Sequence, residues 1–153
     1  MLSYVVVFSL ALSAPVPEDA ALEALAGEWV VIESETFGRS GDLHVGDVLK
    51  FEDDSLTHES GAKPLSYRLR VGTKAEPSQM DWRPAEPDDA KWSHRGIYKI
   101  DGDKLTVCVL SRFESDDEKD RPTEFRTKAG RQKGEAAGNV LLVLKRRKGQ
   151  HSD

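Results

Sequence analysis

The sequence predicts an all-β protein: an up-and-down antiparallel β-barrel of about eight strands, preceded by a short N-terminal helix. Several short segments alternate apolar and polar residues, most clearly Leu65 to Val71. Gly-rich, Asp-Gly and Pro-containing turns separate these segments. Helical periodicity is confined to the N-terminus. A closely related β-sandwich fits the same pattern, but barrel closure has the advantage of leaving no open sheet edge.

Residues 15–27 predict the helix. Pro17 suits a first helical position, Glu18 and Asp19 favour the positive N-terminal end, and Gly27 suits the stop. The strands that follow are predicted from β-branched runs, from alternation and from turn residues at their ends. They cover residues 27–35, 47–52, 55–59, 65–71, 78–82, 95–100, 105–110 and 139–147, and residues 121–126 are predicted to be extended.

The clearest hairpin runs from residue 95 to residue 110, where two apolar strands flank an Asp-Gly dipeptide. A two-residue loop at this dipeptide would place Lys99 opposite Lys104, and like charges directly opposite are unfavourable. We therefore predict a four-residue loop, 101–104. That register gives the hairpin one apolar face that points into the core, formed by Tyr98, Ile100, Leu105, Val107 and Val109.

Residues 1–14 are apolar and uncharged, end in small residues and are too short to span a membrane, which indicates a secretory signal peptide. No basic residue precedes Arg39, so an extra apolar strand or a tail is the competing interpretation. We expect a barrel domain at 15–148, a tail at 149–153, and a periplasmic or secreted location.

The formal net charge of -5 disfavours nucleic acid as a partner, because phosphate binding needs a basic surface. The single cysteine excludes an internal disulfide and a cysteine-based metal site. Cys108 sits in mid-strand, where an inert thiol is the expected state. No two of the four histidines, His44, His58, His94 and His151, have the spacing of a metal site, so we expect scattered surface histidines, although distant residues can still converge in space.

Gly27-Glu28-Trp29 after a short helix resembles the Gly-x-Trp opening of lipocalin-like barrels. That resemblance implies a Trp29 at the closed end of the barrel, covered by Arg146 or Arg147 from the last strand. A more specific resemblance rests on Gly27-Glu28-Trp29 combined, in this order, with Gly96-Ile97-Tyr98, the hairpin turn and Arg121-Pro122-Thr123-Glu124-Phe125. Over residues 22–148 this combination is similar to the uncharacterised lipocalin-like domains common in planctomycete bacteria. The resemblance implies a small, often exported barrel with no established activity.

Two functions follow as hypotheses. The first is a non-enzymatic module that binds a small apolar or amphipathic ligand, or another protein, with ligand-lining or rim residues Tyr67, Asp81, Trp82, Trp92 and Arg121. The second is an enzyme that uses Asp81, Arg121 and Tyr98 around the barrel mouth. A structural salt bridge from Asp81, for example to Arg121, is the commoner role for such a carboxylate. We predict a monomer with no catalytic residue, cofactor or metal. Because the inward residues are bulky, a filled interior would move the function to the surface.

Overall fold

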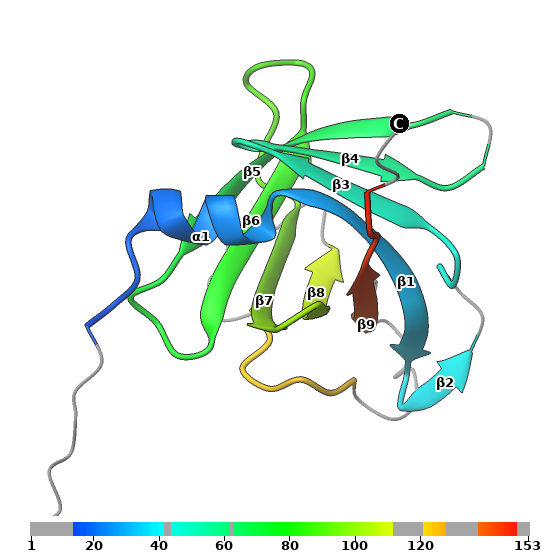
Figure 1. Cartoon of the computed structure of the whole chain (residues 1–153). Helices are drawn as coiled ribbons and strands as arrows, with labels where there is room; N and C mark the ends of the chain where they lie inside the picture. Colours follow the sequence, from blue (N-terminus) through cyan, green and yellow to red (C-terminus); the bar gives the residue numbers. More distant parts are fainter. Residues whose placement is uncertain (1–13, 42–43, 62, 112–120, 128–137, 150–153) are drawn as a thin grey trace, which may run out of the picture.

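The computed structural model describes residues 14–41, 44–61, 63–111, 121–127 and 138–149, and these form a barrel with one helix beside it (Figure 1). The predicted signal peptide, except for its last residue, and the tail beyond residue 149 lie outside the described residues. The elements are α1 (Glu18–Leu25), β1 (Gly27–Thr36), β2 (Arg39–Gly41), β3 (Val48–Glu52), β4 (Ser55–Glu59), β5 (Leu65–Gly72), β6 (Ser78–Pro84), β7 (His94–Asp101), β8 (Lys104–Ser111) and β9 (Asn139–Arg146).

The strands form one antiparallel sheet that closes on itself. From β3 to β9, each strand pairs with the next in sequence, and β1 pairs with both β3 and β9. The pairing of β1 with β9 closes an eight-stranded barrel, so the predicted fold class is confirmed and the sandwich is not formed. The short strand β2 pairs with the end of β1 in a region predicted to be only a Gly-rich turn.

The hairpin of β7 and β8 has the predicted register. Tyr98 lies opposite Val107 and Ile100 opposite Leu105, so the five predicted apolar residues face the interior. The predicted loop length is wrong, because Asp101 also pairs with Lys104 and leaves a two-residue turn, Gly102 and Asp103. Gly102 takes φ 62°, a conformation that glycine adopts at no steric cost.

The inward face of β1 changes part-way along the strand. Trp29 and Val31 are buried, and a register shift against β9 then occurs between Val31 and Glu33. This β-bulge turns Ser34 inward, opposite the core residue Leu142, and directs Glu33 to the exposed side. Glu33 and Glu35 therefore do not enter the core.

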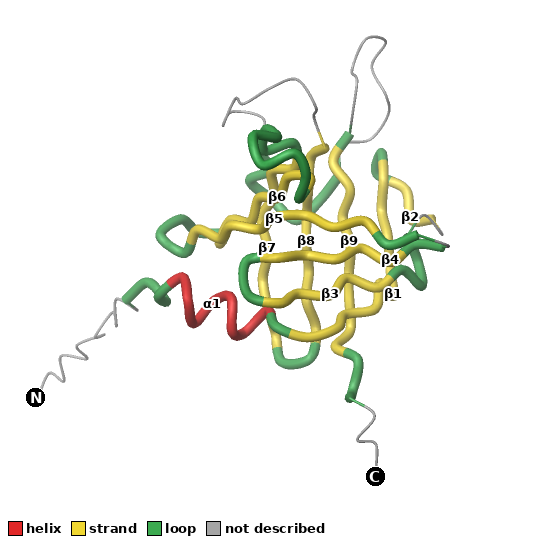
Figure 2. Tube along the Cα trace, turned by 90° about the horizontal axis from the view of Figure 1, so that it is seen from above, coloured by secondary structure: helices red, strands yellow, loops and turns green. Residues whose placement is uncertain are grey.

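The interior of the barrel is filled by side chains. The largest fully buried ones are Trp29, Phe51, Leu25, Leu56, Met80, Ile97, Leu105 and Leu144, and all of these except Ile97 belong to one core cluster. Helix α1 packs against β3 and β5 at the end of the barrel where β1 begins (Figures 1 and 2). We call the opposite end, where β3 begins and β4 ends, the far end.

Residues 121–127, which include the predicted extended segment 121–126, form no strand but lie across the outer face of the barrel. Arg121 donates to the carbonyl of Gly96 in β7, and Lys99 of β7 lies 4.8 Å from the ring centre of Phe125. Further along, Thr127 donates its hydroxyl to Glu35 of β1 at 2.6 Å. No helix in the described part of the chain is long and apolar enough to cross a membrane.

Candidate functional site

Asp81 is buried in the outer layer of the barrel wall, not in the lumen. The strand register sets it beside Arg70 of β5 and Arg95 of β7, and its neighbours Met80 and Trp82 point into the core. Its Oδ1 lies 2.5 Å from Arg121 Nη1, and its Oδ2 accepts from Arg121 Nη2 at 3.0 Å and from Arg70 Nε at 3.0 Å. Asp81 therefore forms a buried bidentate salt bridge that fastens residues 121–127 to the wall.

The structure does not bring together the proposed catalytic cluster of Asp81, Arg121 and Tyr98. Tyr98 is 6% exposed and belongs to the interior core, where burial raises the pKa of its phenol. The carboxylate of Asp81 and the guanidinium of Arg121 lie on the other side of the same wall. The three side chains therefore do not face one common space. The hypothesis of a catalytic cluster of these residues at the barrel mouth is wrong in its geometry.

Trp92 also lies outside the barrel. The guanidinium carbon of Arg70 stands 4.2 Å from the centre of its ring, and that of Arg83 stands 5.6 Å away. Because the same Arg70 pairs with Asp81 on the outer face, the indole covers that outer arginine. Of the five residues expected to line a ligand or the rim, Asp81, Trp92 and Arg121 are therefore outside, and Tyr67 and Trp82 are inside.

At the α1 end, the structure places Arg146 over Trp29. The guanidinium carbon lies 4.1 Å from the centre of the indole ring, and the indole Nε1 donates to Leu25 O at 2.7 Å. The neighbouring Arg147 points outward and pairs with the exposed Glu28 at 3.2 Å. Arg146, not Arg147, is thus the residue that covers the tryptophan.

Three aromatic rings gather on the inner face towards the far end: Tyr67, Trp82 and His94. His94 stacks on Trp82, with ring centres 5.1 Å apart and planes 15° apart, and meets Tyr67 edge-on at 5.7 Å. The register explains the cluster, because Trp82 pairs with His94 across β6 and β7. Burial, and to a smaller extent the nearby His58, lowers the pKa of His94 from 6.5 to about 4. Burial also raises the pKa of Tyr67, so the cluster is uncharged at neutral pH.

A second polar group at the far end consists of His44, Asp47 and His58. His44 Nδ1 lies 2.9 Å and His58 Nε2 2.7 Å from the same oxygen, Asp47 Oδ2. The two imidazole rings are 5.7 Å apart. One ligand atom from each residue lies within 4.8 Å of the other two, and the three side chains are partly buried. These are atoms of the kinds that bind divalent transition metals.

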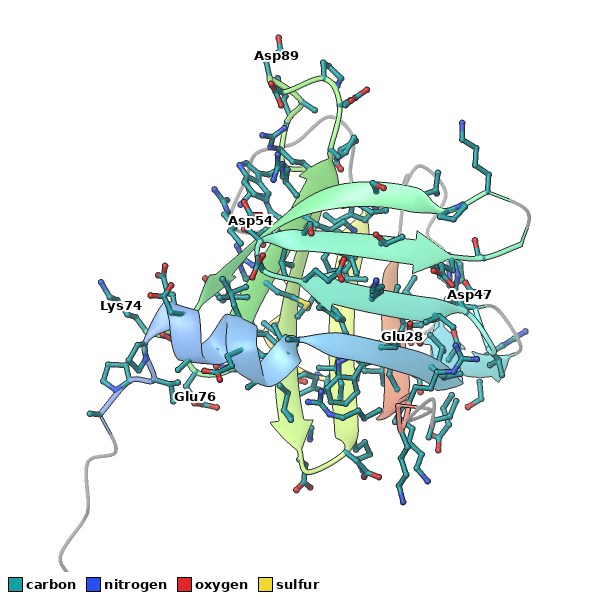
Figure 3. All side chains as sticks on the ribbon, turned by 45° about the horizontal axis from the view of Figure 1, so that its top comes forward. Glu28, Asp47, Asp54, Lys74, Glu76 and Asp89 are labelled. Atoms are coloured by element: carbon teal, nitrogen blue, oxygen red, sulfur yellow. The ribbon has the colours of Figure 1, made fainter. Side chains whose placement is uncertain are left out.

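The expectation of scattered histidines did not anticipate this group, because His58 is well separated in sequence from His44 and Asp47. The register of the β3–β4 hairpin, which can be derived from the sequence, predicts that His58 lies near Asp47. A two-residue turn at Asp53 and Asp54 places Leu49 opposite His58, and the side chain of Asp47 lies two residues along on the same face. Figure 3 shows Asp47 and Asp54 at opposite ends of this hairpin. Pairing the strands explicitly would have brought His58 to Asp47.

We compared the chain with family models, with curated proteins and with solved structures, and nothing matched in any of the three comparisons.

Proposed function

We propose that this protein binds a small amphipathic ligand at the far end of its barrel, against the ring cluster of Tyr67, Trp82 and His94. The observation that carries the proposal is the stack of His94 on Trp82, with Tyr67 at its edge, on the inner face. Uncharged aromatic faces with a phenol at the edge suit a planar apolar group that carries one hydrogen-bonding atom.

The packing of the interior supports a shallow site. Leu56 lies opposite Tyr67, and Leu69 lies opposite Trp82. Both leucines are buried in the core cluster together with Met80, so a ligand would rest on the core at the end of the barrel. Tyr67 and His94 retain part of their exposure, whereas Trp82 is 7% exposed. Eight-stranded barrels are of the size at which side chains fill the interior or leave room for one small ligand.

The fluorescent probe 1-anilinonaphthalene-8-sulfonate tests the proposal, since it combines a planar apolar group with one charge. We expect saturable binding to the wild-type protein and at least a fivefold weaker affinity in Tyr67→Ala. Trp92→Ala is the matched control, because Trp92 is an aromatic residue on the outer face and its removal should leave the affinity unchanged. Equal affinities for the wild type and Tyr67→Ala would contradict the proposal.

A second candidate is a protein-binding surface on the outer wall. A surface hollow of about 360 Å³ lies between β1, β2, β9 and the turn before β3. Four apolar side chains line it, Ile32, Val45, Leu141 and Val143, beside polar ones that include Glu33 and Glu35. Ile32 and Val45 in this hollow are each 44% exposed. If Ile32→Ser weakens probe binding and Tyr67→Ala does not, this hollow is the binding surface.

We also propose that the protein is exported and that it belongs with the lipocalin-like domains it resembles. The apolar, uncharged residues 1–14 support export, and the closed eight-stranded barrel is consistent with the resemblance. Expression of the full chain in a bacterium, followed by N-terminal sequencing of the periplasmic protein, tests export. A full-length cytoplasmic product would contradict it.

A further inference from the structure

We infer that His44, Asp47 and His58 form a binding site for one divalent transition-metal ion. This inference goes beyond the ligand site proposed above and does not depend on it, because different residues carry it. The three side chains offer two imidazole nitrogens and one carboxylate oxygen, and these atoms lie within 4.8 Å of one another.

The two nitrogen–oxygen distances are close to those around a bound ion, and the two nitrogens, which lie within 4.8 Å of each other, would approach by at most about 1.5 Å. A tetrahedral ion with bonds of about 2.0–2.2 Å separates its ligand atoms by about 3.3 Å. The two nitrogens now stand 2.9 Å and 2.7 Å from Asp47 Oδ2, so each must move away by about 0.5 Å. Small side-chain rotations supply such a shift, and the ion then replaces the two hydrogen bonds that hold the group together.

The backbone around the site is fixed by hydrogen bonds to β1. Val31 donates to Asp47 O at 2.9 Å, and Gly46 donates to Val31 O at 2.9 Å. Asp47 in turn donates its backbone N–H to His44 O at 3.0 Å, which closes the turn that carries two of the three ligands. The third ligand, His58, is held by the β3–β4 ladder opposite Leu49. The geometry is therefore set before an ion arrives, which lowers the entropic cost of binding.

The donor set selects the kind of ion. Ca²⁺ and Mg²⁺ prefer shells made of oxygen, so two imidazoles disfavour them. Imidazole together with carboxylate suits Zn²⁺, Fe²⁺, Co²⁺ and Ni²⁺. Three protein ligands leave at least one coordination position for water or for an atom of another molecule. The side chains of Asp47 and His58 are only 16% and 19% exposed, so the surrounding protein partly shields the charge of the ion.

The test is isothermal titration of Zn²⁺ into protein without an affinity tag, since a polyhistidine tag would itself bind the ion. We expect one ion per chain, no competition from millimolar Mg²⁺, and at least a tenfold loss of affinity in Asp47→Asn and in His58→Gln. Glu59→Gln is the matched control. Glu59 is the exposed neighbour of His58. Its replacement removes one negative charge, as Asp47→Asn does, but it removes no metal ligand. The Zn²⁺ affinity of the Glu59→Gln variant should stay within twofold of that of the wild type.

X-ray absorption on the Zn²⁺-loaded wild-type protein tests the site without a variant that must fold. We expect nitrogen and oxygen ligands at about 2.0–2.1 Å with the scattering pattern of two imidazole rings. Absence of one-to-one binding, equal affinity in Asp47→Asn, or a shell without imidazole would each overturn the inference. Loss of Zn²⁺ binding with intact probe binding at Tyr67 would overturn the metal site alone and leave the proposed function standing.

Discussion

Arg146 of the last strand and Trp29 of the first close the α1 end of the barrel together. Besides covering the indole at 4.1 Å, the guanidinium donates from Nη1 to Ala26 O at 2.6 Å and from Nη2 to Ala24 O at 2.7 Å. These carbonyls belong to the C-terminal end of α1, where the helix leaves backbone acceptors without intrahelical partners. One side chain thus ties the helix, the first strand and the last strand together.

Replacing Arg146 with Met should lower the free energy of unfolding by about 2 kcal/mol, because a cation–π contact and two charged hydrogen bonds are lost. Urea denaturation followed by circular dichroism measures the change. Arg147→Met is the matched control, since its ion pair with Glu28 is exposed and should contribute less than about 1 kcal/mol. Equal effects of the two substitutions would contradict the role given to Arg146.

Replacing Asp81 with Ala should destabilise the protein by roughly 3–5 kcal/mol, because it removes a buried carboxylate from the guanidinium groups of Arg70 and Arg121. Asp54→Ala provides the comparison. Asp54 pairs with Arg68 at 3.3 Å on the exposed surface, and such pairs contribute about 0–1 kcal/mol. If Asp81→Ala were as mild as Asp54→Ala in urea denaturation, the buried salt bridge would not hold residues 121–127 in place.

His94 should make stability depend on pH. Its pKa is lowered from 6.5 to about 4 in the folded protein, so below pH 6.5 the unfolded chain binds the proton and the folded chain does not. The stabilisation is complete above pH 6.5 and is lost as the pH falls towards about 4. Between pH 7 and pH 5 the loss should be about 2 kcal/mol.

The measurement for His94 is urea denaturation at pH 7 and pH 5 for the wild type and for His94→Gln. The variant lacks the titrating imidazole, so the difference between the two proteins isolates the contribution of His94 from that of the other histidines. The same pH dependence in both proteins would contradict the prediction. It would show that the imidazole of His94, although stacked on Trp82, is not shielded from solvent in the folded protein.

Cys108 should react slowly with thiol reagents in the folded protein. Burial raises its pKa to about 11, and its thiol donates to Arg126 O at 3.6 Å beneath residues 121–127. Because the thiolate is the reactive form, modification by a disulfide reagent at pH 8 should be at least about a hundredfold slower than in guanidinium chloride. A native rate within tenfold of the denatured rate would mean that residues 121–127 do not cover the thiol.

Local patterns predicted the barrel well because strand alternation and hairpin register are properties of near neighbours. Pairing Tyr98 with Val107 needed only the charges of Lys99 and Lys104. The same alternation favours an outward Asp81, because apolar residues flank it, but it could not supply the partner Arg121, which lies 40 residues further along the chain. The outer position of Asp81 follows from Met80 and Trp82, whose burial fixes the inward face of β6.

The metal-ligating group shows a different limit. His44 lies outside any strand and takes φ 66°, a turn conformation that periodicity does not reveal. The bulge after Val31 likewise depends on pairing with β9, a strand more than 100 residues away in the chain. Tertiary pairing, not composition, decides both features, and both lie towards the far end of the barrel.

Native mass spectrometry of the wild-type protein and of Tyr67→Ala, each purified gently from the same bacterial host, tests whether the far end of the barrel binds a small molecule. We expect a co-purifying small molecule on the wild type that is absent or much reduced on Tyr67→Ala. Identical spectra for the two proteins, with or without a bound mass, would contradict a ligand site at the ring cluster.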